Sequence, residues 1–115
     1  MEYMRRPREY LGQLELMVLL AVVSSGGEAY GVQVSRRIED ASGREVSLAS
    51  VYVALERLES KGLITSRLGE PTPKRGGRAR TYFKPTASGL KEARTACSTL
   101  ARLSGGLVPL KGAFA

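Results

Sequence analysis

Histidine and tryptophan are absent from this sequence of 115 residues, and Cys97 is its single cysteine. Without histidine and with one thiol, the chain excludes zinc fingers, histidine-based metal sites, and Ser–His or Cys–His catalytic machinery. Its acidic residues are spread along the predicted helices with no obvious pair for acid–base catalysis. We therefore expect no enzyme, and no metal or cofactor site.

Long apolar runs are also missing. The longest, Leu16–Val23, is far shorter than the roughly 20 residues of a membrane-spanning helix. The segment MEYMRRPREY (1–10) contains basic residues but no adjoining apolar stretch with a cleavage site, so we expect no secretion signal. Apolar residues make up 43% of the chain and charged residues 25%, which is typical of a globular domain. These features predict a single-domain, cytoplasmic protein with no membrane partner.

Positive charge is what the sequence has in excess, with a net charge of +7. The segment from Arg67 to Lys84 holds six bases and one acid, which gives +5. Its centre, PKRGGRAR (73–80), surrounds two adjacent glycines with four bases: Lys74, Arg75, Arg78 and Arg80. Such a cluster predicts a polyanionic partner, and the alternative is a solvated loop that only aids solubility.

Helical periodicity runs through three segments. A strongly apolar helix is predicted from Leu11, ended by Gly26-Gly27, and a second from about Tyr30 to Ser42, ended by Gly43. Ser47 is a good N-cap for a third helix that Gly62 closes. The inner face of this third helix is predicted to carry four residues: Leu48, Val51, Leu55 and Leu58.

The opposite face of the third helix carries small side chains near its start. Ala49, Ser50 and Val53 lie there, followed by Arg57 and Ser60. Because the first half has no long side chain, it can approach another surface closely. This face is therefore a candidate contact surface.

A β-hairpin and a fourth helix follow. LITSRLG (63–69) and RTYFKPT (80–86) are rich in β-formers and flank a stretch of proline, glycine and charge. Thr86 can cap a helix over 87–104, which Gly105-Gly106 ends. Its apolar face is predicted to consist of Leu90, Ala93, Cys97 and Leu100.

The order helix, helix, helix, hairpin, helix predicts a mainly α fold with a small β-hairpin, the winged helix-turn-helix. In that architecture the third helix enters the DNA major groove and the hairpin, called the wing, contacts the duplex alongside it. We divide the chain into an N-terminal arm (1–9), a winged helix domain (10–86), a C-terminal helix (87–104) and a flexible tail (105–115).

Three segments resemble one known family. AYGVQVSRRIED (29–40), SLASVYVALERLESKGLI (47–64) and RTYFKPTASG (80–89) are together similar to the PadR-like transcriptional regulators, and the likeness covers about residues 10–104. Two positions depart from the family pattern. Val53 stands where a proline is common, and Pro85 replaces a leucine at a position where proline cannot donate to a sheet ladder.

The resemblance implies a homodimeric DNA-binding regulator, most often a repressor that a small-molecule inducer releases from its operator. It implies dimerisation through the last helix, helped by the first, and so through six residues: Leu11, Leu14, Leu90, Ala93, Cys97 and Leu100. Some relatives hold planar ligands between tryptophans, which this chain lacks. An inducer would therefore rest on aliphatic side chains and on Tyr10 or Phe114.

The winged helix architecture assigns candidate DNA contacts. On the third helix, the candidates for base edges are Ser47, Ala49, Ser50 and Val53. Contacts with the DNA backbone are expected from the four wing bases and from Arg57. The hydroxyls of Ser47 and Tyr52 can also donate to backbone phosphates.

Other interpretations stay open for these residues. Ser47 can serve as the N-cap alone, Tyr52 can pack in the core, and Cys97 is expected to pack rather than to sense redox state. As an alternative function, the chain could be a protein-interaction module whose basic wing binds an acidic partner.

Overall fold

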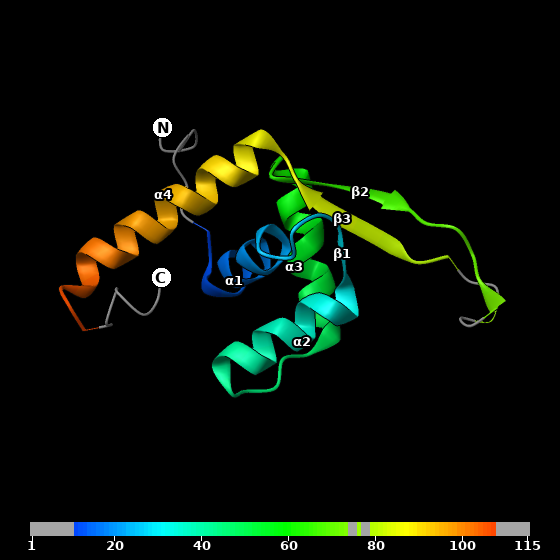
Figure 1. Cartoon of the computed structure of the whole chain (residues 1–115), viewed down its shortest axis with the longest axis horizontal. Helices are drawn as coiled ribbons and strands as arrows, with labels where there is room; N and C mark the ends of the chain where they lie inside the picture. Colours follow the sequence, from blue (N-terminus) through cyan, green and yellow to red (C-terminus); the bar gives the residue numbers. More distant parts are fainter. Residues whose placement is uncertain (1–10, 74–75, 77–78, 108–115) are drawn as a thin grey trace, which may run out of the picture.

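The computed structural model of the chain describes residues 11–73, 76 and 79–107 (Figure 1). The elements follow in the order α1 (Gln13–Val23), β1 (Ala29–Tyr30), α2 (Gly31–Ser42), α3 (Leu48–Ser60), β2 (Ile64–Leu68), β3 (Thr81–Pro85) and α4 (Ala87–Ser104). This confirms the winged helix order and adds one short strand to it. The predicted arm and most of the predicted tail lie outside the described residues.

Helix α1 is the centre of the fold, and α2, α3 and α4 all pack around it (Figure 1). Val18, Leu19 and Val22 are completely buried, and full burial of such a side chain contributes about 1.5–3 kcal/mol. The helix begins later than predicted because Gly12 is extended, with φ −65° and ψ 165°, and acts as its N-cap. The apolar run in the sequence thus forms the core helix.

Helix α3 begins as predicted. The backbone N–H of Ser50 donates to the Ser47 hydroxyl oxygen at 3.3 Å, which is the expected N-cap bond. Val51, Leu55 and Leu58 are fully buried. The prediction for Leu48 is wrong, because burial on α3 starts only at Val51 and leaves Leu48 40% exposed in the first turn.

The sheet has three strands in the order β1–β3–β2, all antiparallel. Tyr30 was expected to open the second helix, but it pairs with Tyr82 of β3 and caps α2, which starts at Gly31. Pro85 is the last residue of β3, opposite Ile64, so its missing N–H interrupts no further ladder. Ile64 and Phe83 are buried in the core.

Helix α4 has the predicted range of 87–104, from Ala87 to Ser104. The Thr86 hydroxyl oxygen accepts from the Gly89 backbone N–H at 3.0 Å, and the hydroxyl itself donates to the Gly62 carbonyl at 2.8 Å. The first half of α4 packs on the domain, whereas the second half extends away from it (Figure 1). Within the described part of the chain, neither α4 nor any other helix is long and apolar enough to cross a membrane.

Candidate nucleic-acid interface

The outer face of α3 is open to solvent. Ala49, Ser50 and Val53 are all exposed, Val53 to 45% of its surface. They line one side of a cleft of about 400 Å³ whose other side is the start of α1, at Gly12 and Leu14. Leu14, expected at a dimer interface, therefore lies beside the candidate base-contacting residues. The three small side chains form a shallow surface that a groove edge can approach.

Tyr52 lies at the edge of this face, and its side chain is 42% exposed. Its ring packs directly on Gly31, the first residue of α2: a Cβ at position 31 would lie 2.5 Å from the Tyr52 hydroxyl oxygen. Only glycine leaves room for the ring in this position. The ring thus packs against α2 while part of the residue stays exposed, and the phosphate contact of Tyr52 stays a prediction.

Arg57 shares a carboxylate with Lys61. The Nη1 of Arg57 lies 3.7 Å from Glu15 Oε2, and Lys61 Nζ lies 2.8 Å from Glu15 Oε1. The Arg57 side chain is still 66% exposed. Because exposed pairs of this kind are worth about 0–1 kcal/mol, Arg57 remains available to a backbone phosphate.

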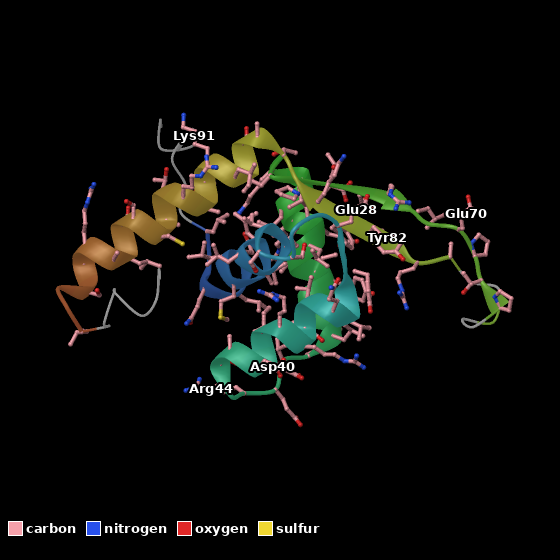
Figure 2. The ribbon with its side chains drawn as sticks, in the orientation of Figure 1. Glu28, Asp40, Arg44, Glu70, Tyr82 and Lys91 are labelled. Atoms are coloured by element: carbon pink, nitrogen blue, oxygen red, sulfur yellow. The ribbon has the colours of Figure 1, made fainter. Side chains whose placement is uncertain are left out.

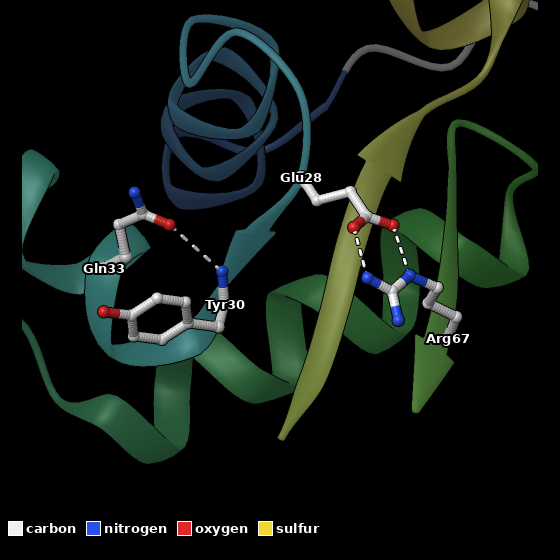
Figure 3. Close-up of polar contacts among 4 residues, drawn as sticks. All are labelled: Glu28, Tyr30, Gln33 and Arg67. Carbon is white, nitrogen blue, oxygen red and sulfur yellow. Dashed lines mark hydrogen bonds and ion pairs between the residues drawn. The ribbon is translucent and has the colours of Figure 1, made fainter. Parts of the chain in front are cut away.

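Arg67 on β2, one of the six bases counted from Arg67 to Lys84, is paired. Its Nε and Nη2 donate to the two carboxylate oxygens of Glu28, each at 2.6 Å (Figure 3). These hydrogen bonds lower the pKa of Glu28 and raise the pKa of Arg67. The pair could not be predicted from the sequence, because the two residues are 39 positions apart. They come together only when β1, which follows Glu28, pairs with β3 beside β2.

Arg80 is held by an aromatic ring. Its guanidinium carbon lies 3.8 Å from the centroid of the Tyr30 ring, a cation–π contact. The Tyr30 ring meets Tyr82 edge to face, with centroids 6.0 Å apart. The side chain of Gln33 in turn accepts from the Tyr30 backbone N–H at 3.3 Å (Figure 3). Arg80 is therefore held in a defined orientation at the base of the wing.

The other wing bases divide into two groups. Lys84 on β3 is exposed. Lys74, Arg75 and Arg78 lie outside the described residues, so their predicted role stays a prediction. Figure 2 shows Tyr82 and Glu28 near the base of the hairpin and Glu70 further along it.

The candidate dimer residues are spread from the core to the surface. Ala93 is 4% exposed and belongs to the core of its own subunit, so it leaves almost no surface for a partner. Leu100, in contrast, is 52% exposed. Leu103 and Leu107, which helical periodicity did not single out, are 77% and 86% exposed. The remaining candidates are half-buried: Leu11, Leu14, Leu90 and Cys97.

A second cleft, of about 630 Å³, lies between α1 and α2. Met17, Leu20, Ile38 and Ala41 give it an apolar lining, with Arg37 beside them. Tyr10 and Phe114, named above as possible ligand contacts, lie outside the described residues. Over the residues that the structure does describe, no three potential metal-ligating side chains come together.

The fold agrees with a comparison against protein families. The model of the transcriptional regulator PadR-like family matches residues 19–95. The chain belongs to this family. Members of the PadR-like family are transcriptional regulators and not enzymes, as the sequence predicts here. A comparison with curated proteins gave no match.

Solved structures of other transcriptional regulators show the same fold. The chain is 26% identical to a PadR family transcriptional regulator from Eggerthella lenta, covering 91% of this chain and 82% of that one, with a TM-score of 0.67. A transcriptional regulator from Clostridium thermocellum is 25% identical, with coverages of 81% and 87% and a TM-score of 0.65. Bacillus subtilis PadR, solved in complex with operator DNA, is 21% identical, with coverages of 74% and 46% and a TM-score of 0.63.

Proposed function

We propose that this PadR-like protein is a homodimeric repressor that binds a palindromic operator through the outer face of α3 and the basic wing. The observation that carries the proposal is the open, small-residue face of α3, at Ala49, Ser50 and Val53, in a winged helix. The positive charge concentrated in the neighbouring hairpin supports it, because phosphate neutralisation supplies the sequence-independent part of DNA affinity.

On α3, we assign base contacts to Ala49, Ser50 and Val53 by hydroxyl hydrogen bonds and by apolar contact with thymine methyl groups. Tyr52 and Arg57 bind backbone phosphates at the groove edges and so fix the register of the helix. Ser47 already accepts a cap bond from Ser50. Its hydroxyl hydrogen remains free to donate to a phosphate.

In the wing, we assign contacts with the duplex backbone to Lys74, Arg75 and Arg78, which the sequence gathers around two glycines. Arg80 contributes from a fixed position on Tyr30. The wing thus combines an oriented cation at its base with a cluster of bases further along the hairpin.

The homodimer forms through the second half of α4. Leu100 and Leu103 are exposed on a helix segment that extends beyond the rest of the subunit, and Leu107 follows just after the helix ends. Exposed leucines gathered near the end of one helix are candidates for such a contact. Under twofold symmetry, the same leucines on a second copy are their natural complement, and the dimer then presents two α3 helices to the two half-sites.

Release by a small molecule is the expected mode of regulation in this family. The aliphatic cleft between α1 and α2 is the larger of the two clefts described above and has a cation, Arg37, at its edge. We keep the identity of the inducer open.

The experiment that tests this function selects bound sequences from a random duplex library and then footprints the enriched site. We expect a palindrome whose half-site centres are about one helical turn apart, or a multiple of that distance. A Val53→Glu variant should lose the enriched site, because a carboxylate would face the bases. If the wild-type protein enriches no sequence at low salt, the proposal is wrong and an acidic protein partner becomes the better explanation.

A further inference from the structure

One face of the small sheet gathers aromatic and charged side chains. Tyr82 on the central strand β3 stands opposite Tyr30 of β1 on one side and opposite Arg67 of β2 on the other. Directly opposed residues of an antiparallel sheet share a face. Glu28 lies two residues before Tyr30, so it reaches the same face and meets Arg67 across β3 (Figure 3).

The Glu28 carboxylate binds the edge of the Arg67 guanidinium that carries Nε and Nη2, which is its best edge for binding an oxyanion. Both hydrogen bonds measure 2.6 Å and use the Nε and Nη2 donors as a parallel pair. The guanidinium also lies 4.9 Å from the centroid of the Tyr82 ring. A bidentate edge of this kind is the one with which arginine binds a phosphate. The Glu28 carboxylate therefore occupies the guanidinium edge with which Arg67 would bind a phosphate.

Arg57 is bound to its carboxylate partner more weakly than Arg67 is. It has a single contact of 3.7 Å to Glu15, a carboxylate that Lys61 already binds at 2.8 Å. Glu28, by contrast, has its pKa lowered mainly by the hydrogen bonds from Arg67, and it stays ionised at neutral pH. The two arginines therefore differ in how freely they can exchange a carboxylate for a phosphate.

We propose that Glu28 limits the sequence-independent DNA affinity of the wing by holding Arg67 away from backbone phosphates. The logarithm of the DNA-binding constant falls linearly with the logarithm of the salt concentration. Each arginine that neutralises a phosphate makes this slope steeper by about 0.9, whatever the DNA sequence. Withholding one arginine per subunit lowers background binding along the genome. This inference rests on the proposed function, because it concerns the same wing and the same duplex.

The test measures binding to a 30-base-pair duplex of unrelated sequence between 50 and 200 mM salt. For Glu28→Gln, we expect the magnitude of the salt slope to increase by about 0.9 per bound subunit, so the affinity gain over wild type is larger at 50 mM than at 200 mM by about threefold for each bound subunit. Asp40→Asn is the control, since it removes the same charge from an exposed acid on α2 that forms no ion pair with a described residue. Its slope should equal that of wild type.

Arg67→Gln provides a second, independent readout. In the wild-type background we expect an unchanged slope, because Arg67 is already neutralised. In the Glu28→Gln background, the same change should return the slope to the wild-type value. A purely structural role of the pair would produce neither the gain nor its reversal, and melting curves confirm that each variant is folded.

Three results would overturn the inference: a wild-type slope for Glu28→Gln, an equal increase for Asp40→Asn, or a decrease of about 0.9 for Arg67→Gln alone. The Arg67→Gln measurement does not need the Glu28→Gln variant, so it tests the inference even if Glu28→Gln fails to fold. If the wild-type protein selects its operator but shows one of these results, only the inference fails. If the wild-type protein binds no duplex at 50 mM salt, the proposed function fails with it.

Discussion

The ring of Tyr52 occupies the space that a side chain at Gly31 would need. This contact joins the start of α2 to the exposed edge of α3, where the candidate DNA-contacting residues lie. Tyr30 and Gly31 lie in AYGVQVSRRIED (29–40), one of the three segments that resemble the PadR-like family. The structure gives Gly31 a physical reason, because the glycine places an aromatic ring at the edge of the interface.

Gly31→Ala should therefore weaken DNA binding while leaving the protein folded. The methyl group displaces the far end of a side chain rather than backbone, so Tyr52 moves and the fold remains. The variant should lose the proposed hydrogen bond from the Tyr52 hydroxyl to a DNA phosphate. Loss of one hydrogen bond to a charged group costs about 1.5–3 kcal/mol, which lowers operator affinity tenfold or more. Fluorescence anisotropy measures this affinity. Gly27→Ala, with no atom within 4 Å of the new Cβ, is the control, and equal affinities of both variants would refute the assignment.

Gly89→Ala should lower stability. A Cβ at this position in α4 would overlap the carbonyl oxygen of Leu63, which also accepts the Thr86 backbone N–H. Because backbone cannot yield as a side chain does, we expect a loss of about 1–3 kcal/mol or more. That corresponds to a fall in melting temperature of at least about 4 °C, measured by circular dichroism. Gly12→Ala meets no atom within 4 Å and should melt like wild type; matching curves for both would contradict the packing.

The Glu28–Arg67 pair should make stability depend on pH in a defined direction. Hydrogen bonds from Arg67 hold the pKa of Glu28 below its ordinary value of 4.5, with the charges of Arg67 and Lys84 acting in the same sense. The stabilisation is therefore present above the unfolded pKa and is lost as pH falls through the folded one. Urea unfolding should show Glu28→Gln less stable than wild type at pH 7, with the gap closing at pH 3. If the difference in unfolding free energy between Glu28→Gln and wild type did not change with pH, the Glu28–Arg67 ion pair would not stabilise the fold.

The exposed leucines of α4 should hold the dimer together. Leu100→Asp combined with Leu103→Asp places charges among these leucines, and we expect a monomer in sedimentation velocity experiments. Operator affinity should fall by about 10²-fold or more, because two linked half-site contacts become separate. The control pair Thr95→Asp and Ser98→Asp changes exposed residues on the other side of the helix. A dimer that survives the leucine changes would place the interface elsewhere.

Local signals in the sequence were enough to predict the limits of α3 and α4, but not the starts of α1 and α2. The cap at Ser47, the cap at Thr86 and the glycine at 105 act within a few residues, so the limits of α3 and α4 could be predicted from short stretches. Strand β1 could not, because its two residues form a strand only through pairing with Phe83 and Tyr82, more than fifty positions away.

The same limit applies to the candidate site. The small outer face of α3 follows from helical periodicity, which is local, and the structure shows Ala49, Ser50 and Val53 exposed as expected. Counting charges along the wing missed that Arg67 has a partner, because Glu28 comes near it only once the sheet has formed. Burial of Ala93 was missed for a similar reason, since an apolar helix face does not show which part its own subunit covers.

The central proposal is that the basic residues of the wing bind duplex DNA, and the salt dependence of operator binding measures this contact. The decisive comparison is between wild type and the Arg75→Ala, Arg78→Ala double variant. We predict that the variant binds all sequences more weakly, with a salt slope that is smaller by about 0.9 for each phosphate that the wing no longer neutralises. Unchanged affinity together with an unchanged slope would show that the wing does not bind DNA.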